Sequence, residues 1–427
     1  MKNFAKISLY VLMVAAFAFY LPRLYDALIS ERIEGTHLFY SPVSKKFIYT
    51  EKVAAYDPAA ASKAEDHHAD IVYKDQDGVY HHRLEFERLL PFIYYRNMEI
   101  RGYLPLEIDG KVFDKNTIRA ERRVLELPAR AIGANTPSEH VYPLFESMPD
   151  QAGLVFPDDR FRMTESAMEF INADYNVVDP DLTQRFTSAL TSAGFVFPAR
   201  LVAGNFTILK PYDFGVFIVD AEHSVYHVRR AKGDPVVVRT PISQSIAPRH
   251  IMVAESDREG YCAVMLGGDG SLYLIPAQSY TPIRMPLENY DPARMDFKII
   301  FDPLYRTALW SDTATIRAVA MDENFEPVAR YEHSMSRGTR TWRHEARDVL
   351  FPFTLQLDSH ISRLKEASVT RSPYWLTWGL LSGAGFCLVF EAVRRIRRRQ
   401  GAAWGAWGAI VAFGVFGFIA ALTIEEV

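Results

Sequence analysis

Residues 215–240 read GVFIVDAEHSVYHVRRAKGDPVVVRT, and this stretch decides the class of fold. Three short runs, at 215–221, 225–230 and 236–240, are rich in Val, Ile, Phe and Tyr. Two turns, at 222–224 and 233–235, separate them. β-Branched and aromatic residues favour extended chain, and short turns containing Gly, Asp or Pro join antiparallel neighbours. The stretch therefore predicts three strands in an antiparallel meander.

The same pattern recurs twice further along the chain. Two more hairpins are predicted, 261–266 with 271–276 and 313–321 with 325–331. The turns at Asp220, Asp269 and Asp322 are 49 and 53 residues apart. Repeats of about 40–50 residues with several strands each are typical of propeller blades. We predict a mainly β fold with a β-propeller-like domain and minor helices; a large sandwich or an irregular β domain is the alternative.

The part of the chain before residue 201 has a mixed pattern of strands and helices. Strands are predicted at 38–43, 46–51, 71–74 and 79–83, and a loop at 54–69. Arg83–Arg101 has helical spacing but contains Pro91, which predicts a broken or kinked helix. A short helix is predicted over Asp181–Ala193, because Asp179-Pro180 is a typical helix start.

An apolar segment near the N-terminus, residues 7–28, follows two lysines. Ala16-Phe17-Ala18 resembles the cleavage site of a signal peptide, so removal of the segment is one interpretation. The apolar run continues past that site through Phe19–Leu21, which favours an uncleaved signal anchor.

Two further apolar segments, 373–393 and 402–423, are each long enough to cross a bilayer of about 30 Å. Basic loops stay on the cytoplasmic side of a membrane, and the loop between these segments is rich in arginine. The residues predicted to determine the topology are Arg394, Arg395, Arg397, Arg398 and Arg399. The N-terminus is then cytoplasmic, residues 30–372 lie outside the cytoplasm, and Val427 faces outward.

These segments predict three transmembrane helices around one extracytoplasmic domain. The expected divisions are a signal anchor (1–29), a mixed α/β front part (30–200), a propeller-like hairpin repeat (201–354), a polar and partly helical linker (355–372) and a transmembrane hairpin (373–423). Within the last division, small residues recur at the four-residue spacing that lets membrane helices approach closely. The predicted helix-packing residues are Gly379, Gly383, Gly408 and Gly417. They serve either contact between the two helices or docking onto a separate membrane subunit.

No catalytic, cofactor-binding or metal-binding residue can be assigned from the sequence. His67 and His68 lie in a loop predicted to be solvated, and neighbouring strand residues such as His81 and His82 point to opposite faces. Gly267-Gly268-Asp269-Gly270 lacks the Lys-Ser/Thr of a phosphate-binding loop, so we interpret it as a hairpin turn. Residues 27–390 contain more acidic than basic side chains, and an acidic domain predicts no nucleic-acid partner. The cysteines Cys262 and Cys387 predict no internal disulfide.

Several phrases resemble an uncharacterised family of bacterial membrane-anchored proteins that carries a domain of unknown function. These phrases are 38–43 (LFYSPV), 73–101 with LLPFIYYR at 89–96, 140–157 (HVYPLFESMPDQAGLVFP) and 195–199 (FVFPA), together with the first apolar segment and the closing pair of apolar segments. Members of that family resemble accessory proteins of ABC transporter systems. The resemblance implies a bacterial inner (cytoplasmic) membrane, with the domain in the periplasm, and permease and ATPase subunits as partners. It supplies no catalytic residues.

The topology and the resemblance together favour a membrane-anchored accessory or binding protein, without enzymatic activity, that works with an ABC-type transport system. The alternative is a membrane-tethered propeller enzyme, a hydrolase or a lyase, because propellers can assemble a site from distant loops. A signal-transducing sensor is the weakest alternative, since the predicted cytoplasmic parts are too short for an output domain.

Overall fold

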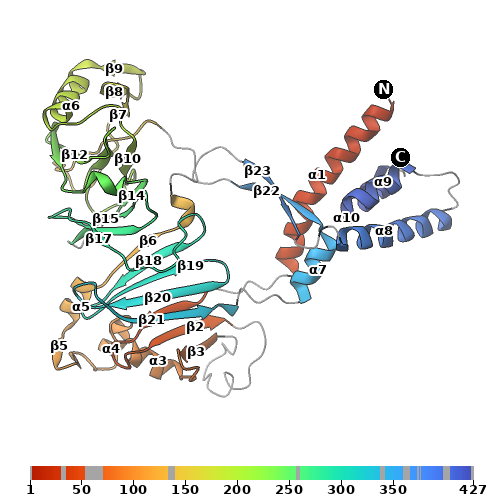
Figure 1. Ribbon diagram of the computed structural model, residues 1–427, viewed down its shortest axis with the longest axis horizontal. Helices are drawn as coiled ribbons and strands as arrows, with labels where there is room; N and C mark the ends of the chain where they lie inside the picture. The colour runs from red at the N-terminus through yellow and green to blue at the C-terminus, as the bar shows by residue number, and fades with distance from the viewer. Residues whose placement is uncertain are drawn as a thin grey trace. The chain divides into compact units, whose positions relative to one another are not determined.

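The computed structural model describes residues 2–29, 35–52, 71–132, 140–255, 260–336, 342–358, 366–372, 375, 377–397 and 404–424 (Figure 1). The chain forms two compact units. One, here called the β unit, is Gly35–Met335; the other, the helical unit, combines Met1–Glu34 with Ser336–Val427. The prediction of a mainly β protein is confirmed, because strands make up most elements of the larger unit.

Three consecutive meander sheets form the centre of the β unit, each with neighbouring strands antiparallel. The first contains β10 (Leu201–Gly204), β11 (Val216–Val219), β12 (Val225–Ala231) and β13 (Asp234–Arg239). The second contains β14 (His250–Val253), β15 (Tyr261–Leu266), β16 (Leu272–Pro276) and β17 (Ile283–Arg284). The third contains β18 (Asp296–Phe301), β19 (Arg306–Ser311), β20 (Thr315–Met321) and β21 (Pro327–Ser334). The predicted hairpins are therefore confirmed.

Strands from the front of the chain extend and flank these sheets. β6 (Arg123–Leu127) pairs with β18 and gives the third sheet a fifth strand. One flanking sheet contains β1 (His37–Tyr40), β2 (Phe47–Lys52) and β3 (Ile71–Asp75), and another contains β7 (Asp159–Met163), β8 (Met168–Asn172) and β9 (Val177–Asp179). The remaining elements are the hairpin β4 (Leu106–Ile108) with β5 (Lys111–Phe113) and the helices α3 (Arg83–Leu89), α4 (Tyr95–Ile100), α5 (Lys115–Glu121) and α6 (Pro180–Ser192).

The two helix predictions for this part are confirmed. The helical segment predicted over 83–101 is broken into α3 and α4, with α3 ending two residues before Pro91. α6 begins after Asp179, whose carboxylate accepts a hydrogen bond from the Leu182 N–H at 2.9 Å. This is the usual way to satisfy an unpaired N–H in the first turn of a helix.

The sheets of the β unit stack face to face, with buried side chains between them (Figure 1). Along β11, Val216 and Ile218 pack with β7, β8 and α6, whereas Phe217 and Val219 pack with β14, β15 and β16. The third sheet likewise faces β15 and β16 on one side and β1 and β2 on the other. A sheet covered on both faces needs apolar residues at consecutive positions, which explains the unbroken apolar run Val216–Val219.

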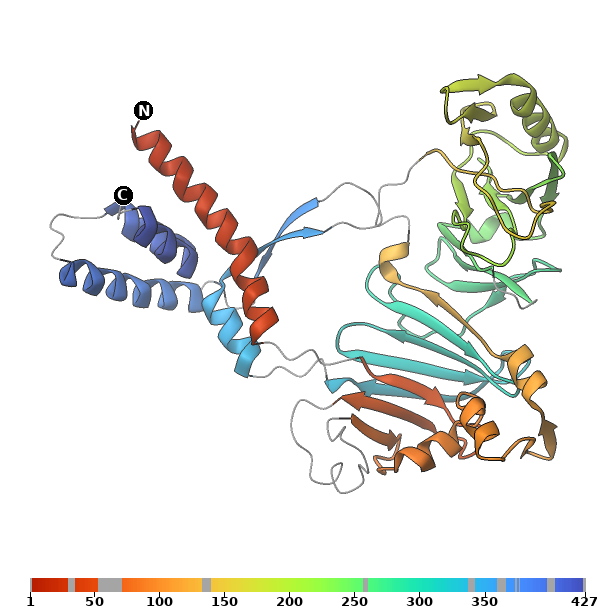
Figure 2. The same cartoon turned by 180° about the vertical axis from the view of Figure 1, so that it is seen from behind.

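The stack is open at its ends within the described part of the β unit. The sheet β7–β9 lies at one end and β1–β3 at the other, and no buried cluster of described residues joins them (Figures 1 and 2). A propeller needs its first and last blades side by side. For the described residues, the propeller-like prediction is therefore wrong. The strand predicted at 79–83 is also wrong, because Tyr80 makes only an isolated bridge to Lys74 before α3 begins.

The helical unit contains α1 (Lys2–Leu28), α7 (Trp342–Leu350), β22 (Phe353–Asp358), β23 (Glu366–Arg371), α8 (Thr377–Ile396), α9 (Trp404–Phe413) and α10 (Val415–Ile424). The C-terminal part of α1 is held by α7, because the Asp26 carboxylate accepts hydrogen bonds from the Arg347 guanidinium at 2.8 and 3.2 Å. Residues predicted as a partly helical linker instead form the antiparallel hairpin β22–β23 (Figure 2). The alternation of Leu355 and Leu357 with polar neighbours fits strands better than a helix.

Among the described helices, only Phe4–Leu28 is both long and apolar enough to cross a membrane, judged by length and composition. Of the three predicted spans, only the first meets this test among the described residues. The segment 402–423, expected as one span, contains two ten-residue helices joined at Gly414, whose φ is 58°. A left-handed residue ends an α-helix, and each of these helices is only about 15 Å long. α10 folds back on α9, since a Cβ at Gly417 would overlap the Ala409 carbonyl oxygen.

Candidate functional site

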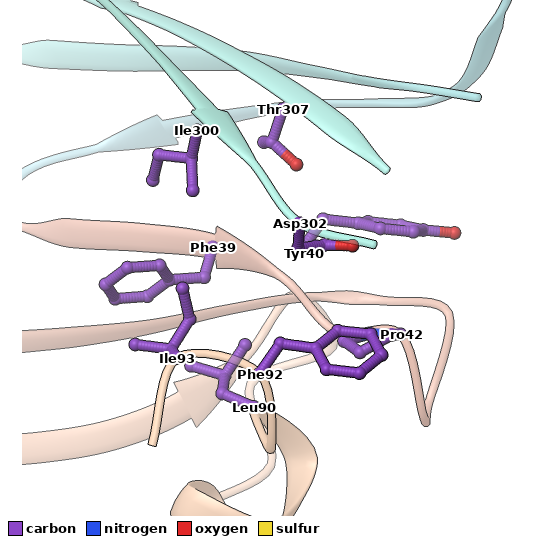
Figure 3. Close-up of a pocket in the computed structure, with 9 residues that line it drawn as sticks. All are labelled: Phe39, Tyr40, Pro42, Leu90, Phe92, Ile93, Ile300, Asp302 and Thr307. Carbon is purple, nitrogen blue, oxygen red and sulfur yellow. The ribbon is translucent and has the colours of Figure 1, made fainter. Parts of the chain in front are cut away.

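A small pocket of the β unit lies where β1 faces β18 and β19 (Figure 3). Figure 3 shows Phe39, Ile93 and Ile300 grouped on one side, and Tyr40 beside Asp302 on the other. The complete lining is Phe39, Tyr40, Pro42, Leu90, Phe92, Ile93, Ile300, Asp302 and Thr307. Most of these side chains are hydrocarbon, Tyr40 and Thr307 add hydroxyl groups, and Asp302 is the charged residue of the lining.

This pocket brings together two stretches that are distant in the sequence, LFYSPV at 38–43 and LLPFIYYR at 89–96. The Ser41 hydroxyl donates a hydrogen bond to the Leu89 carbonyl at 2.6 Å, which joins the turn after β1 to the end of α3. Pro91 prevents continuation of α3, and the residues that follow it enter the pocket. The two most distinctive apolar phrases of the front part therefore form one site.

Asp302 immediately follows β18 and is only 6% exposed. One of its carboxylate oxygens accepts hydrogen bonds from the N–H groups of Leu304 and Tyr305, both at 2.8 Å. Burial raises the pKa of Asp302 to about 6, although these backbone donors and the Arg306 guanidinium act in the opposite direction. The carboxyl group therefore changes its charge close to neutral pH, unlike an exposed aspartate.

One lysine and two tyrosines lie near Asp302. The Lys45 ammonium donates a hydrogen bond to the Tyr305 hydroxyl at 2.9 Å and pairs with the Asp109 carboxylate. The rings of Tyr305 and Tyr40 meet edge to face, with 4.9 Å between their centroids. Lys45 favours the ionised form of Asp302, but its charge is already shared with Asp109.

The size of the pocket limits what it can do chemically. Its free volume is about 10 Å³, which is room for about one water molecule. Sites for small organic ligands usually have roughly 300–1,000 Å³. In this conformation the site can hold a proton and a water beside the Asp302 carboxyl and the Thr307 hydroxyl.

A second buried polar cluster involves the phrase YPLFESMP at 142–149. The Lys210 ammonium donates hydrogen bonds to the Asp213 and Glu255 carboxylates at 2.7 and 2.9 Å and lies 4.8 Å from the centre of the Phe145 ring. The Ser147 hydroxyl donates to Asp213 at 2.7 Å. Burial raises the pKa of Glu255, and Lys210 opposes that shift. This cluster locks the β10–β11 loop to the front of the chain; no spacing in the sequence indicated it.

The predicted topology-determining and helix-packing residues lie in the helical unit. Arg394 and Arg395 lie 3.3 and 3.5 Å from the Glu391 carboxylate, whereas Arg398 and Arg399 lie outside the described residues. Arg397 follows the end of α8.

The four predicted packing glycines differ in their surroundings. A Cβ at Gly383 would lie 3.3 Å from the Ile410 carbonyl oxygen of α9, and one at Gly417 would overlap the Ala409 backbone, also of α9. Gly379 lies against Pro352, with 3.3 Å between a Cβ there and the Pro352 Cβ. At Gly408 a Cβ would meet nothing within 4 Å. Contacts within the unit therefore account for three of the four glycines.

The histidines considered as metal ligands are only partly described. His67 and His68 lie outside the described residues. The His81 ring nitrogens lie 3.6 Å from the Asp75 carboxylate and 3.3 Å from the Glu85 carboxylate, and His82 precedes α3. No group of three or more metal-ligating side chains occurs among the residues that the structure describes. Cys262 and Cys387 are free thiols.

An N-terminal apolar helix and an open stack of meander sheets define a β protein with one candidate membrane anchor. Residues 37–321, about two thirds of the chain, match the family described as Domain of unknown function (DUF4857), and the chain belongs to that family. Both phrases that line the pocket lie inside the matched range. Among curated proteins, none matches the chain.

Proposed function

We propose that this protein is a membrane-anchored binding protein whose β unit lies outside the cytoplasm. The observation that carries the proposal is the exposure of large apolar side chains on the helical unit. Phe4 and Leu12 of α1 are 77% and 68% exposed, and Leu388 of α8 is 75% exposed. Extended apolar surfaces of this kind are rare on proteins surrounded by water, whereas lipid solvates them well.

The charge pattern supports a cytoplasmic N-terminus and a cytoplasmic loop after α8, because Lys2, Lys6 and the five arginines lie there. The turn at Gly414 changes the expected position of the last helix. Since α9 and α10 fold back on each other, Ile424 returns to the side of the arginine loop. We therefore place Ile424 on the cytoplasmic side, opposite to the side that a continuous span would give.

The proposed partners are the permease and ATPase subunits of an ABC-type transporter, with the permease contacting α8 in the bilayer. Leu381, Gly385 and Leu388 recur at four- and three-residue spacing on that helix, and all three are exposed. Such a face combines a close approach at the glycine with two large side chains, which suits docking against another membrane helix. The resemblance to accessory proteins of such systems is the further support.

A mild-detergent pull-down of the tagged chain from its native membrane, followed by mass spectrometry, tests this proposal. We expect a permease and an ATPase in a constant ratio, and their loss with Gly385→Leu, which fills the docking face. Gly405→Leu is the matched control, because a Cβ at either glycine meets nothing within 4 Å. Recovery of the chain alone, or equal recovery with both variants, would contradict the proposed docking face.

One observation favours the alternative of a membrane-tethered hydrolase or lyase. A buried carboxyl with a pKa near 6 is suited to general acid–base catalysis. Such activity would require the pocket of Figure 3 to open, because about 10 Å³ excludes a substrate. Binding of a substrate-sized molecule that Asp302→Asn abolishes would support this alternative.

A further inference from the structure

A larger hollow lies within the helical unit, between the hairpin β22–β23, the start of α8 and the turn that joins α9 to α10. Its free volume is about 480 Å³, within the roughly 300–1,000 Å³ of typical ligand sites. Phe353, Val411 and Phe413 are large apolar residues of its lining, and two glycines, Gly379 and Gly408, here called the glycine floor, also line it. The hollow is therefore an apolar groove of ligand size, here called the glycine groove.

The glycine groove has one charged residue in its lining, an arginine. Arg371, the last residue of β23, lines it together with Trp375, and the guanidinium carbon lies 5.1 Å from the centre of the Trp375 ring. Among the described residues, no carboxylate lies within ion-pair distance of Arg371. Arginine and tryptophan are typical of the membrane–water interface, where the ring faces hydrocarbon and the guanidinium faces phosphate.

The floor of the groove is open at Gly408. Two other glycines of the helical unit lie in close contact with α9. Gly417 of α10 and Gly383 of α8 both lie against its backbone. A methyl group added at Gly408 would have no heavy atom within 4 Å, so none of the described side chains fills this space. A molecule other than the described part of this chain can occupy it.

We propose that the glycine groove binds a phospholipid with an anionic headgroup, with one acyl chain against the glycine floor and the phosphate at Arg371. This inference rests on the proposed placement of the helical unit in a membrane. A guanidinium in the lining of an otherwise apolar groove complements a lipid with an anionic head and an apolar tail. A free phosphate would use Arg371 alone, and an apolar partner helix would leave that charge without a counter-ion.

The test uses the full chain, purified in mild detergent and mixed with dioleoyl phosphatidylglycerol or dioleoyl phosphatidylcholine, with bound lipids counted by native mass spectrometry. We expect one tightly retained lipid, and roughly five-fold tighter retention of phosphatidylglycerol. Gly408→Leu fills open space, so it should leave the fold intact and weaken both lipids by roughly ten-fold. Arg371→Gln should remove the preference for phosphatidylglycerol, and Arg371→Lys should keep most of it. Gly405→Leu is the control and should change neither value, because a Cβ at Gly405 meets nothing within 4 Å and Gly405 does not line the groove.

Equal lipid retention by the Gly408→Leu variant and the unaltered chain would overturn the proposal. Inorganic phosphate is a second probe. If it displaced phosphatidylglycerol and phosphatidylcholine equally well, the groove would bind only an anion and the proposal would be overturned. If Gly408→Leu left lipid retention unchanged but removed a co-purifying membrane protein, the groove would bind a partner helix instead of a lipid. A chain that does not sediment with membranes would contradict the proposed function itself, whereas a membrane-bound chain without a specific lipid would contradict only this inference.

Discussion

The β unit and the helical unit both contain long apolar runs, but they place them in opposite surroundings. In β11 all four residues are buried, because sheets cover both faces of the strand. In α1 most large apolar side chains are exposed, with Ile7 at 63% and Phe4 at 77%. The same residue types are therefore solvated by protein in one unit and, in our proposal, by lipid in the other. An apolar run alone does not identify its solvent; the structure around it does.

The largest expected effect comes from a cavity inside the stack. Phe217 is 1% exposed and packs between the first and second meander sheets. Phe217→Ala should lower the free energy of unfolding of the β unit by about 3–5 kcal/mol, measured by chemical denaturation. Ile7→Ala in α1 is the matched comparison and should change that value by less than about 0.5 kcal/mol. Equal effects of the two substitutions would contradict the difference between the units.

A pH-dependent effect of nearly this size is expected at Asp302. Its folded pKa of about 6 lies above the ordinary value of 3.8, so the protonated group stabilises the fold fully below about pH 4. That contribution is lost as the pH rises through about 6, and it amounts to at most about 3 kcal/mol. Asp302→Asn can keep the two backbone hydrogen bonds and removes the charge. It should therefore stabilise the β unit more at pH 7 than at pH 4.

Asp312→Asn is the control for this measurement. Asp312 accepts hydrogen bonds from the N–H groups of Ala314 and Thr315 at 2.7 and 2.8 Å, the same turn pattern as Asp302, at a more exposed position. Because its side chain is more exposed, its substitution removes no buried charge and should not stabilise the β unit at pH 7. If Asp302→Asn behaved in the same way, the buried carboxyl would not be the origin of the pH dependence.

The hairpin of the helical unit should respond to a single methyl group. At Gly417 a Cβ would overlap the Ala409 backbone, so Gly417→Ala should separate α9 from α10 and lower stability by about 1–3 kcal/mol. Thermal unfolding in detergent measures this change. Gly405→Ala, at a position with open space, should be neutral or slightly stabilising. A neutral Gly417→Ala would show that α9 and α10 do not form this hairpin.

The sequence predicted local structure well and long-range packing poorly. The strand Tyr261–Leu266 has the predicted bounds, because an apolar run of strand length ends at a Gly-Asp turn. The open stack could not be predicted, since pairing of Leu127 with Phe297 joins segments far apart in the chain. The break at Gly414 was missed because the residues on both sides are equally apolar. Hydropathy does not report a left-handed residue within an apolar run.

The candidate site shows the same division. Its two apolar phrases are distinctive in the sequence, but no pattern there predicts that they meet at Asp302. An aspartate before Pro303 in a turn is ordinary, and only its burial distinguishes it. Three of the four predicted packing glycines lie in close contacts, as expected. The open space at Gly408 could not be predicted, because it depends on how α9 turns.

Labelling of single cysteines from one side of the membrane tests the central claim most directly. Cys262→Ala and Cys387→Ala provide the background, and Glu323→Cys in the β20–β21 turn and Thr423→Cys near the end of α10 provide the reporters. With a membrane-impermeant maleimide on spheroplasts, we expect labelling at 323 without permeabilisation and at 423 only after it. Labelling of both residues in intact spheroplasts would contradict the fold-back of α9 and α10 in the membrane. Recovery of the chain in the soluble fraction would contradict the membrane-anchored account as a whole.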